Sequence, residues 1–395
     1  MKKQTNCRLC KSEDMYKFLD LGFHPHSDQF RKDNTEPEVR YPLTVQNCRN
    51  CGLAQLGQVV DAHDLYTKDY LYEASITKTA DKHWSDLVDD VIAKTGINNG
   101  VSVDIGGNDG TLALKFKDKG FEAWNVDPCS EVCEISESRG VITVNDFWGH
   151  SALPDADIIT GTNVFAHVDD LDAFMEEVNV TLKKDGVFVF ESPYFAEFLA
   201  GLEWDTVYHQ HLSYLSLRPL VPFLEKYGFE VFDVAKTPLH GGGFRVFIAR
   251  KGQRTVSPNV QEMLDSEIWI EEELMQWGQA CEKYRDELFD LIHDLYKQDK
   301  TIACVSSPAK GMTMLNYTGI GRFISFITEK SKLKIGRYTP GTKMLIESDD
   351  KLIERQPDYA LILAWNFSEE IIKNNPEYKG KWIIPLPTIQ IVEGR

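Results

Sequence analysis

Four cysteines near the N-terminus have the spacing of a metal site. They form two Cys-x-x-Cys pairs, Cys7/Cys10 and Cys48/Cys51, each in a polar, turn-forming stretch. Two such pairs supply the four thiolates that tetrahedral zinc requires, and a site filled by protein leaves no position for a reacting water. A redox dithiol is the alternative, but it needs one pair at a helix start in a thioredoxin-like unit, which neither pair has. The spacing predicts a structural zinc site.

A glycine-rich loop further along the chain could hold a ligand. The loop consists of Gly106, Gly107, Asn108, Asp109 and Gly110. An apolar strand is expected before it and a helix after it, and glycines there let the backbone approach a ligand closely. The Gly-x-Gly-x-x-Gly spacing of NAD enzymes is absent, and the aspartate would repel a pyrophosphate. An acid at this place instead suits the positive charge of S-adenosylmethionine.

Three residues beyond this loop suit a nucleoside. Asp127 ends an expected strand about 20 residues after the loop, where an acidic side chain can hold the hydroxyls of a ribose. Asp146 and Phe147 offer an acceptor for an adenine amino group beside an aromatic face. The alternative interpretation of so short a motif is a turn that needs glycines only for its backbone conformation and binds no ligand. The order of loop, ribose acid and adenine pair favours S-adenosylmethionine.

Length and composition predict a soluble, cytoplasmic protein of two or three domains. The chain has 395 residues, no apolar stretch of the ~20 residues that span a bilayer, and no signal peptide. Its net charge is −18 and it has no long basic run, so we expect neither nucleic acid nor a membrane as partner. Alternating strands and helices predict α/β domains with parallel sheets, joined by one long amphipathic helix over 260–298. The sequence has no signal for an oligomeric state.

With these residues in hand, the sequence resembles the sugar C-methyltransferases of deoxysugar biosynthesis, which methylate a carbon of nucleotide-linked keto sugars. The matching segments are CRLC, CRNC, DLGFHPHSDQF, VDIGGNDGT, NVFAHVDDL, FESPYF, YHQHLSYLS, LHGGGFRV, NYTGIG, GRYTPGT and LAWNFSEEI. The resemblance implies a zinc-binding domain (1–65), a class I, Rossmann-like S-adenosylmethionine-dependent methyltransferase domain (66–252), and a long helix with a Rossmann-like domain (253–395). The nucleotide-linked sugar is expected between the last two.

Methylation of carbon needs a base. A carbon next to a ketone is a weak acid, and the enolate that forms has to be stabilised before it attacks a methyl group. Neutral imidazole is the obvious base at pH 7. The Tyr-x-Glu-His pattern of the family matches Tyr208, Gln210 and His211 here, so the resemblance implies His211 as general base and Tyr208 as its hydrogen-bonding neighbour. From the residues alone, a buried histidine satisfied by backbone is the preferred interpretation.

The resemblance extends to further site residues. His167, in NVFAHVDDL, resembles an active-site histidine beside the cofactor, and a residue at a helix start is the alternative. Tyr70, Tyr72 and Ser75 are expected to close over the methyl-donor side. The residues expected to bind the substrate are Tyr72, Tyr194, Gln210, His240, Arg245 and Lys310. A metal pair formed by His209 and His211 lacks a third ligand of convincing spacing.

Two departures from the family pattern stand out. Gln210 replaces a glutamate, and an amide cannot hold the charge that would raise the basicity of the histidine. Ser306, Ser307 and Pro308 replace glycines before Lys310, which remains as the cation for a phosphate. Alternatives to C-methylation are O- or N-methylation of a sugar, or a non-catalytic binding protein on the same scaffold. An NAD oxidoreductase is more distant, because neither loop has the spacing for a diphosphate.

Overall fold

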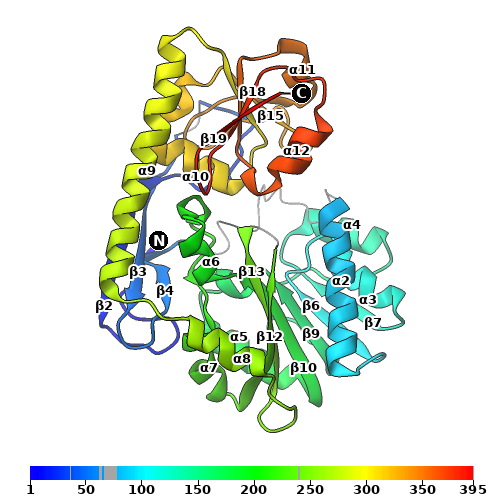
Figure 1. Ribbon diagram of the computed structural model, residues 1–395. Helices are drawn as coiled ribbons and strands as arrows, with labels where there is room; N and C mark the ends of the chain where they lie inside the picture. Colours follow the sequence, from blue (N-terminus) through cyan, green and yellow to red (C-terminus); the bar gives the residue numbers. More distant parts are fainter. Residues whose placement is uncertain (36, 62–64, 66–77, 239–240, 395) are drawn as a thin grey trace.

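The computed structural model describes residues 1–35, 37–61, 65, 78–238 and 241–394. These residues form sheets of four, seven and six strands and a small ribbon of β1 (Lys2–Lys3) with β5 (Gln58–Val59). Figure 1 shows the seven-stranded sheet below the six-stranded one, with the long helix α9 (Glu271–Lys297) running along one side of the molecule. Among the described helices, none is both long and apolar enough to cross a membrane.

The four-stranded sheet is built mainly from the N-terminal region. Its antiparallel strands, in spatial order, are β11 (Ser213–Tyr214), β4 (Ala54–Leu56), β3 (Tyr41–Cys48) and β2 (Met15–His24). The turn between β3 and β4 contains the second Cys-x-x-Cys pair. The edge strand β11 comes from more than 150 residues further along the chain, a distance on the order of a whole domain. The proposed zinc region is therefore in direct contact with a segment from the middle of the chain, through the pairing of β4 with β11.

The seven-stranded sheet has the order β12-β13-β10-β9-β6-β7-β8. Its strands are β6 (Val101–Ile105), β7 (Glu122–Val126), β8 (Ile142–Val144), β9 (Ala156–Thr162), β10 (Leu182–Pro193), β12 (Phe229–Thr237) and β13 (Gly243–Arg250). All neighbours are parallel except β13, which is antiparallel to both β10 and β12. Its helices are α2 (Lys78–Thr95), α3 (Thr111–Asp118), α4 (Ser130–Ser138), α5 (Leu171–Thr181), α6 (Phe195–Ala200) and α7 (Leu217–Glu225). The predicted parallel α/β sheet is confirmed.

The six-stranded sheet has the order β16-β15-β14-β17-β18-β19. Its strands are β14 (Ile302–Val305), β15 (Phe326–Glu329), β16 (Ile346–Ser348), β17 (Tyr359–Ile362), β18 (Lys381–Ile384) and β19 (Gln390–Glu393), the last of them antiparallel. Its helices are α10 (Ala309–Thr318), α11 (Asp350–Arg355) and α12 (Ser368–Asn374). The central strands β14 and β17 are apolar and mostly buried, as in sheets whose two faces are covered by helices.

Both large sheets reverse their strand order at one point. Strand β6 lies between β7 and β9, and strand β14 lies between β15 and β17. In open parallel sheets, ligands bind beyond the carboxyl ends of the strands at such a reversal. The glycine loop follows β6, and the Ser306–Pro308 turn follows β14. Each of these two segments therefore lies at the strand reversal of its sheet.

The prediction of one continuous helix over 260–298 is wrong. The structure has α8 (Pro258–Ser266) and then α9, separated by four residues that begin at Glu267. The Glu267 side chain is buried, and its two carboxyl oxygens accept the backbone N–H groups of Leu217 and Arg218 at 2.7 Å each. These N–H groups belong to the first turn of α7, where a helix leaves donors unsatisfied. Glu267 caps another helix, and the chain leaves helical conformation there.

Helix α9 packs closely on the N-terminal sheet through a glycine. Gly278 is buried, and a Cβ atom at this position would lie 2.0 Å from the carbonyl oxygen of Phe18 in β2. The other buried residues on this face of α9 include Leu274, Cys281, Leu288 and Ile292. The absence of a side chain at residue 278 therefore sets how closely the helix approaches the strand.

We expect Gly278→Ala to lower the free energy of unfolding by about 1–2 kcal/mol. The gain in helix propensity is about 1 kcal/mol, whereas forcing a methyl group against a strand carbonyl that has little room to move costs roughly 2–3 kcal/mol, the upper part of the range for overpacking. The thermal unfolding midpoint measures the difference. Gln279→Ala, exposed on the same helix, is the matched control and should leave the midpoint unchanged. A Gly278→Ala protein as stable as the wild type would contradict this packing.

Candidate active site

The four N-terminal cysteines come together as a metal-binding cluster. Their sulfur atoms all lie within 4.8 Å of one another. The Sγ atoms of Cys7 and Cys51 are 3.5 Å apart, as are those of Cys10 and Cys48. Each pair is closed by a tight turn in which the first cysteine's carbonyl accepts a backbone N–H, from Lys11 or from Gly52. The donor set of four thiols fits a structural zinc ion.

The cysteine hairpin also supports a distant loop. Strand β4 follows Cys51 directly and pairs with β11, with Ser213 opposite Gln55 and Tyr214 opposite Ala54. The backbone N–H of Leu56 adds a hydrogen bond to the carbonyl of Leu212 at 3.0 Å. The segment just after His211 is therefore an edge strand of the zinc-region sheet.

The glycine loop and Asp127 are joined by hydrogen bonds at the reversal of the middle sheet. The Asp127 carboxyl accepts the backbone N–H of Asn108 at 3.0 Å and that of Cys129 at 2.9 Å, and burial raises its pKa. Gly106 and Gly110 have positive φ angles of 62° and 74°, which favour glycine. The loop therefore lies beside the predicted ribose acid, and these residues fit a bound nucleoside.

Gly107 has no room for a side chain. A Cβ atom there would lie 2.1 Å from Asn125 Oδ1 and 2.5 Å from Asp104 Oδ2. Asp104 is a buried acid in β6 that the sequence analysis did not select, although a charged residue in an apolar strand is a usable signal. Burial raises its pKa to about 7, and its Oδ2 has no hydrogen-bond partner among the described residues. Such an orphaned oxygen beneath the loop supports a ligand above it.

Asp109, by contrast, has a structural contact. Its Oδ1 accepts the backbone N–H of Thr111 at 3.2 Å and the Thr111 hydroxyl at 2.7 Å, which satisfies the first backbone donor of α3. Arg139 lies 3.3 Å from its other oxygen. The predicted contact of Asp109 with the cofactor stays a prediction, because this carboxylate already has partners within the protein.

The predicted adenine pair follows β8, next to the ribose acid. The backbone N–H of Asp127 donates to the carbonyl of Val144 at 3.1 Å. The Asp146 carboxyl accepts the Ser151 hydroxyl at 2.6 Å and the N–H of Phe147 at 2.8 Å, and these bonds lower its pKa. The structure thus brings the loop, the ribose acid and the adenine pair to one edge of the middle sheet.

The three predicted catalytic residues also come together. The ring centroids of Tyr208 and His211 are 4.0 Å apart, and the rings of His167 and His211 stack at 5.0 Å. His167 ends the short helix η1 (Phe165–His167) that follows β9, and burial lowers its pKa to about 4. His211 Nδ1 lies 2.8 Å from the carbonyl oxygen of Thr206. Two distant segments thus form one aromatic group beside the middle sheet.

A small pocket opens beside this aromatic group. Its lining is formed by Ala166, Pro193, Tyr194, Phe195, Phe198, Thr206, His211, Ser213 and Tyr214. The hydroxyls of Ser213 and Tyr214 are buried and have no hydrogen-bond partner within the described part of the chain. Sequence reasoning missed Thr206, Ser213 and Tyr214. The first acts through its backbone, which has no sequence signal, and the other two lie inside the YHQHLSYLS match.

Other predicted substrate residues lie in contacts within the protein. Arg245 Nε donates to Glu191 at 2.7 Å and its NH1 to Asp90 at 2.6 Å. Gln210 Nε2 donates to the Asp28 carboxyl at 3.2 Å. Lys310 is described below, and its contact with substrate, like that of Arg245 and Gln210, stays a prediction. Four predicted residues lie outside the described residues: Tyr70, Tyr72, Ser75 and His240.

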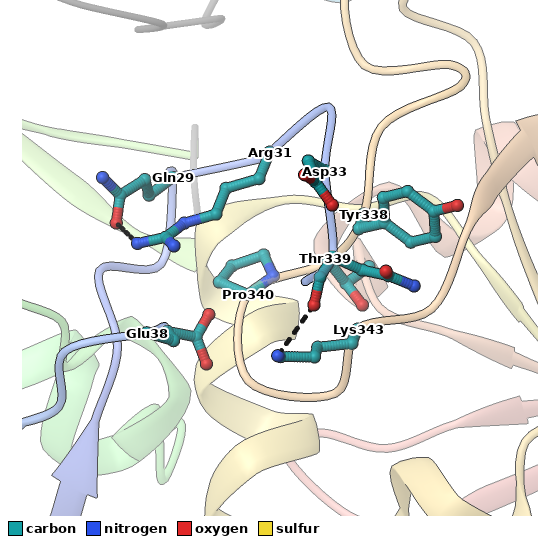
Figure 2. A pocket seen from close by; sticks show the side chains of 9 residues that line it. Gln29, Arg31, Asp33, Glu38, Tyr338, Thr339, Pro340 and Lys343 are labelled. Atoms are coloured by element: carbon teal, nitrogen blue, oxygen red, sulfur yellow. Dashed lines mark hydrogen bonds between the residues drawn. The ribbon is translucent and has the colours of Figure 1, made fainter. Parts of the chain in front are cut away.

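A second pocket lies where the N-terminal segment meets a loop of the C-terminal region (Figure 2). Its lining is formed by Gln29, Arg31, Asp33, Asn34, Glu38, Tyr338, Thr339, Pro340 and Lys343. Arg31 NH1 donates to the carbonyl of Pro37 at 2.8 Å, and Lys343 Nζ donates to that of Asn34 at 2.9 Å. The Lys343 bond therefore joins the C-terminal loop to the N-terminal segment, whereas the Arg31 bond lies within that segment.

Comparison with known proteins identifies the family. Three family profiles match in order: a zinc binding domain over 7–66, a methyltransferase domain over 76–234 and a C-methyltransferase C-terminal domain over 238–387. The C-methyltransferase NovU of Streptomyces niveus is 31% identical over 407 aligned positions, which cover 98% of this chain and 96% of NovU. This chain belongs to the C-methyltransferase family. The family predicted from the sequence is confirmed, with S-adenosylmethionine as methyl donor and zinc at the four cysteines.

Solved methyltransferases are similar to part of this C-methyltransferase. An S-adenosylmethionine-dependent methyltransferase of Clostridium acetobutylicum is 14% identical with a TM-score of 0.37, and the match covers 43% of this chain and 92% of that one. The magnesium protoporphyrin IX methyltransferase ChlM of Synechocystis PCC 6803, solved with bound SAH, is 10% identical with a TM-score of 0.37, over 46% and 90% of the two chains. The middle sheet has the predicted class I methyltransferase fold, on the evidence of its family profile and strand order.

We expect Gly107→Ala to weaken the binding of S-adenosylhomocysteine to this C-methyltransferase at least ~10-fold, which corresponds to about 1.4 kcal/mol. The added methyl group would displace Asn125 and Asp104 and with them the loop. Isothermal titration calorimetry measures the dissociation constant. Gly161→Ala in β9 is the matched control, because its Cβ would meet only Phe188 at 3.8 Å. Equal affinity of wild type and Gly107→Ala would contradict this site.

We expect Cys51→Ser to remove zinc and loosen the edge strand β11. Loss of one thiolate opens the four-ligand site, and the hairpin that pairs with β11 loses its metal. Metal analysis of the purified chain measures zinc, and hydrogen exchange of the Leu56 amide measures the strand pairing. Cys129→Ser, outside the cluster, should keep its zinc. Slow exchange at Leu56 in zinc-free protein would show that the strand does not depend on the metal.

Proposed function

We propose that this C-methyltransferase methylates a carbon next to the ketone of a nucleotide-linked keto-deoxysugar, with His211 as general base. The activity class follows from the family, and the resemblance of the whole chain to sugar C-methyltransferases supports the substrate class. One observation carries the role of His211: its Nδ1 lies 2.8 Å from the carbonyl oxygen of Thr206.

This contact fixes the tautomer of the imidazole ring. A carbonyl oxygen can only accept a hydrogen bond, so Nδ1 must carry the proton that it donates to Thr206. In the neutral ring the other nitrogen, Nε2, then holds the lone pair. A histidine held in this form can take a proton at Nε2, which is what a general base requires. The same bond favours the imidazolium that forms afterwards, because the carbonyl dipole faces it.

The neighbours of His211 suit this role. Burial lowers the pKa of His167 to about 4, so this ring is neutral at pH 7 and does not repel the proton that arrives on His211. Gln210 is a neutral amide bound to Asp28, so no carboxylate at residue 210 raises the basicity of the base. Tyr208, with its ring against His211, orients the sugar or its enolate.

The proposed reaction has two steps, removal of a proton and transfer of a methyl group. His211 Nε2 takes the proton from the carbon next to the ketone, and the C–H electron pair forms an enolate on the sugar. The hydroxyls of Ser213 and Tyr214, which line the pocket, offer donors to sugar oxygens. S-adenosylmethionine supplies the methyl group, which the enolate carbon accepts while the electron pair of the breaking C–S bond returns to sulfur.

We expect His211→Ala to lower kcat/KM by roughly 10²–10⁴-fold, the usual contribution of a general base. The assay mixes the full chain with a panel of nucleotide-linked keto sugars and isotope-labelled S-adenosylmethionine. In D₂O, a keto sugar incubated with wild-type protein and S-adenosylhomocysteine should exchange the proton next to its ketone for deuterium. The same sugar incubated with His211→Ala should not. His293→Ala, on α9 against Phe289, is the matched control and should retain both activities.

Three results would contradict this function. Methylation of a hydroxyl or amino group, seen by NMR of the product, would replace C-methylation. Proton exchange and turnover that persist in His211→Ala would assign the base to another residue. Turnover of free sugars in preference to nucleotide-linked ones would remove the nucleotide from the substrate class.

A further inference from the structure

The segment just before the proposed base is buried against the C-terminal sheet. Asp205 lies in the short helix η2 (Trp204–Thr206), and its side chain is fully buried. Its Oδ2 accepts the indole N–H of Trp365 at 2.7 Å. Trp365 begins the short helix η5 (Trp365–Phe367), which follows β17. A carboxylate from the middle of the chain is therefore bound at the strand reversal of the C-terminal sheet.

Lys310 belongs to the same contact. It lies in the first turn of α10, after β14, and its Nζ is 4.3 Å from the centroid of the Trp365 ring. This Nζ has no hydrogen-bond partner among the residues that the structure describes. Burial raises the pKa of Asp205, and the Lys310 ammonium and the Trp365 bond oppose that rise. Burial also raises the pKa of Glu203 to about 8, and the Lys310 ammonium opposes that rise as well.

A second bond fixes the other end of the segment. The hydroxyl of Thr313 in α10 donates to the carbonyl of Val207 at 3.1 Å. The same hydroxyl is 3.4 Å from that of Ser27 in the N-terminal region. Between the two anchors, at Asp205 and Val207, lies Thr206, whose carbonyl holds His211 Nδ1. The C-terminal region therefore binds Asp205 and Val207, the residues on either side of Thr206, whose carbonyl sets the tautomer of His211.

We propose that Asp205 is a positioning residue, through which Trp365 of the C-terminal sheet holds the Thr206 carbonyl against His211. The proposal rests on the proposed function, in which His211 is the base. Bound in this way, the C-terminal region does more than carry substrate: it decides which nitrogen of the base holds the proton. Without the Trp365 bond, η2 can shift, and a shift of about 1 Å breaks a hydrogen bond of this length.

The tautomer itself can be measured without a substrate. The full zinc-loaded chain, labelled with ¹⁵N-histidine and saturated with S-adenosylhomocysteine, gives one pair of ring nitrogen signals per histidine. The difference spectrum against His211→Gln assigns the pair of His211. We expect a protonated Nδ1 and an unprotonated Nε2 in the wild type. Trp365→Phe keeps an aromatic ring but removes the N–H, and its His211 should lose the protonated Nδ1 signal.

Matched variants separate positioning from general loss of structure. Trp382→Phe changes another buried tryptophan of the same sheet, which packs on Tyr378 in a separate cluster, and should leave the His211 signals unchanged. Asp205→Asn retains an acceptor oxygen for Trp365 and should keep the wild-type pattern, whereas Asp205→Ala should lose it. If Trp365→Phe does not fold, the Asp205 pair makes the same comparison.

The outcomes distinguish this proposal from the proposed function. A wild-type His211 pattern in folded Trp365→Phe and in Asp205→Ala would overturn the positioning role, even if His211→Ala abolishes proton exchange. Loss of the Nδ1 signal in these variants, with proton exchange retained in His211→Ala, would support the coupling and reject His211 as the base. A wild-type His211 protonated at Nε2 would overturn the positioning role outright.

Discussion

Burial of the segment 203–214 is the constraint on which this site depends. A buried loop cannot hydrogen-bond to water, so its backbone polar groups need partners in the protein. They find them in the zinc-region sheet, in the C-terminal region and within the segment itself. Leu212 accepts from β4 of the zinc-region sheet, Val207 accepts from α10 of the C-terminal region, and Thr206 accepts from His211 itself. The same bonds that satisfy the loop also fix the imidazole ring.

In this arrangement the strand reversals of the two large sheets have different roles. At the reversal of the middle sheet, where the cofactor is predicted, Gly107 packs directly on Asn125 and Asp104, and Asp127 joins the loop to the next strand. Strands β14 to β18 of the C-terminal sheet have the same order as β6 to β10 of the middle sheet, but the reversal of the C-terminal sheet receives Asp205 from within the chain. The two similar folds thus have different functions, because the residues that follow the strands, and not the sheet, decide what is bound.

The sequence predicted those parts of the fold that have a strong local pattern. Parallel strands are short apolar runs that alternate with helices, and this alternation predicted both α/β sheets; the two-residue β11 has no comparable pattern. The helix over 260–298 was predicted as continuous because its apolar spacing continues through the break. Glu267 ends the first helix by capping α7, about 50 residues earlier in the chain, and a periodicity of 3.6 cannot reveal such a partner.

By itself, the sequence determined the zinc ligands and the family and predicted the cofactor loop, because each rests on short motifs whose spacing matches one chemistry. Only the tertiary structure decided how the candidate base is held. Arg245, expected near the sugar, faces Glu191 across two strands, and His211 owes its tautomer to a backbone carbonyl. Backbone groups are the same in every residue, so their part in a site appears only once the chain has folded around them.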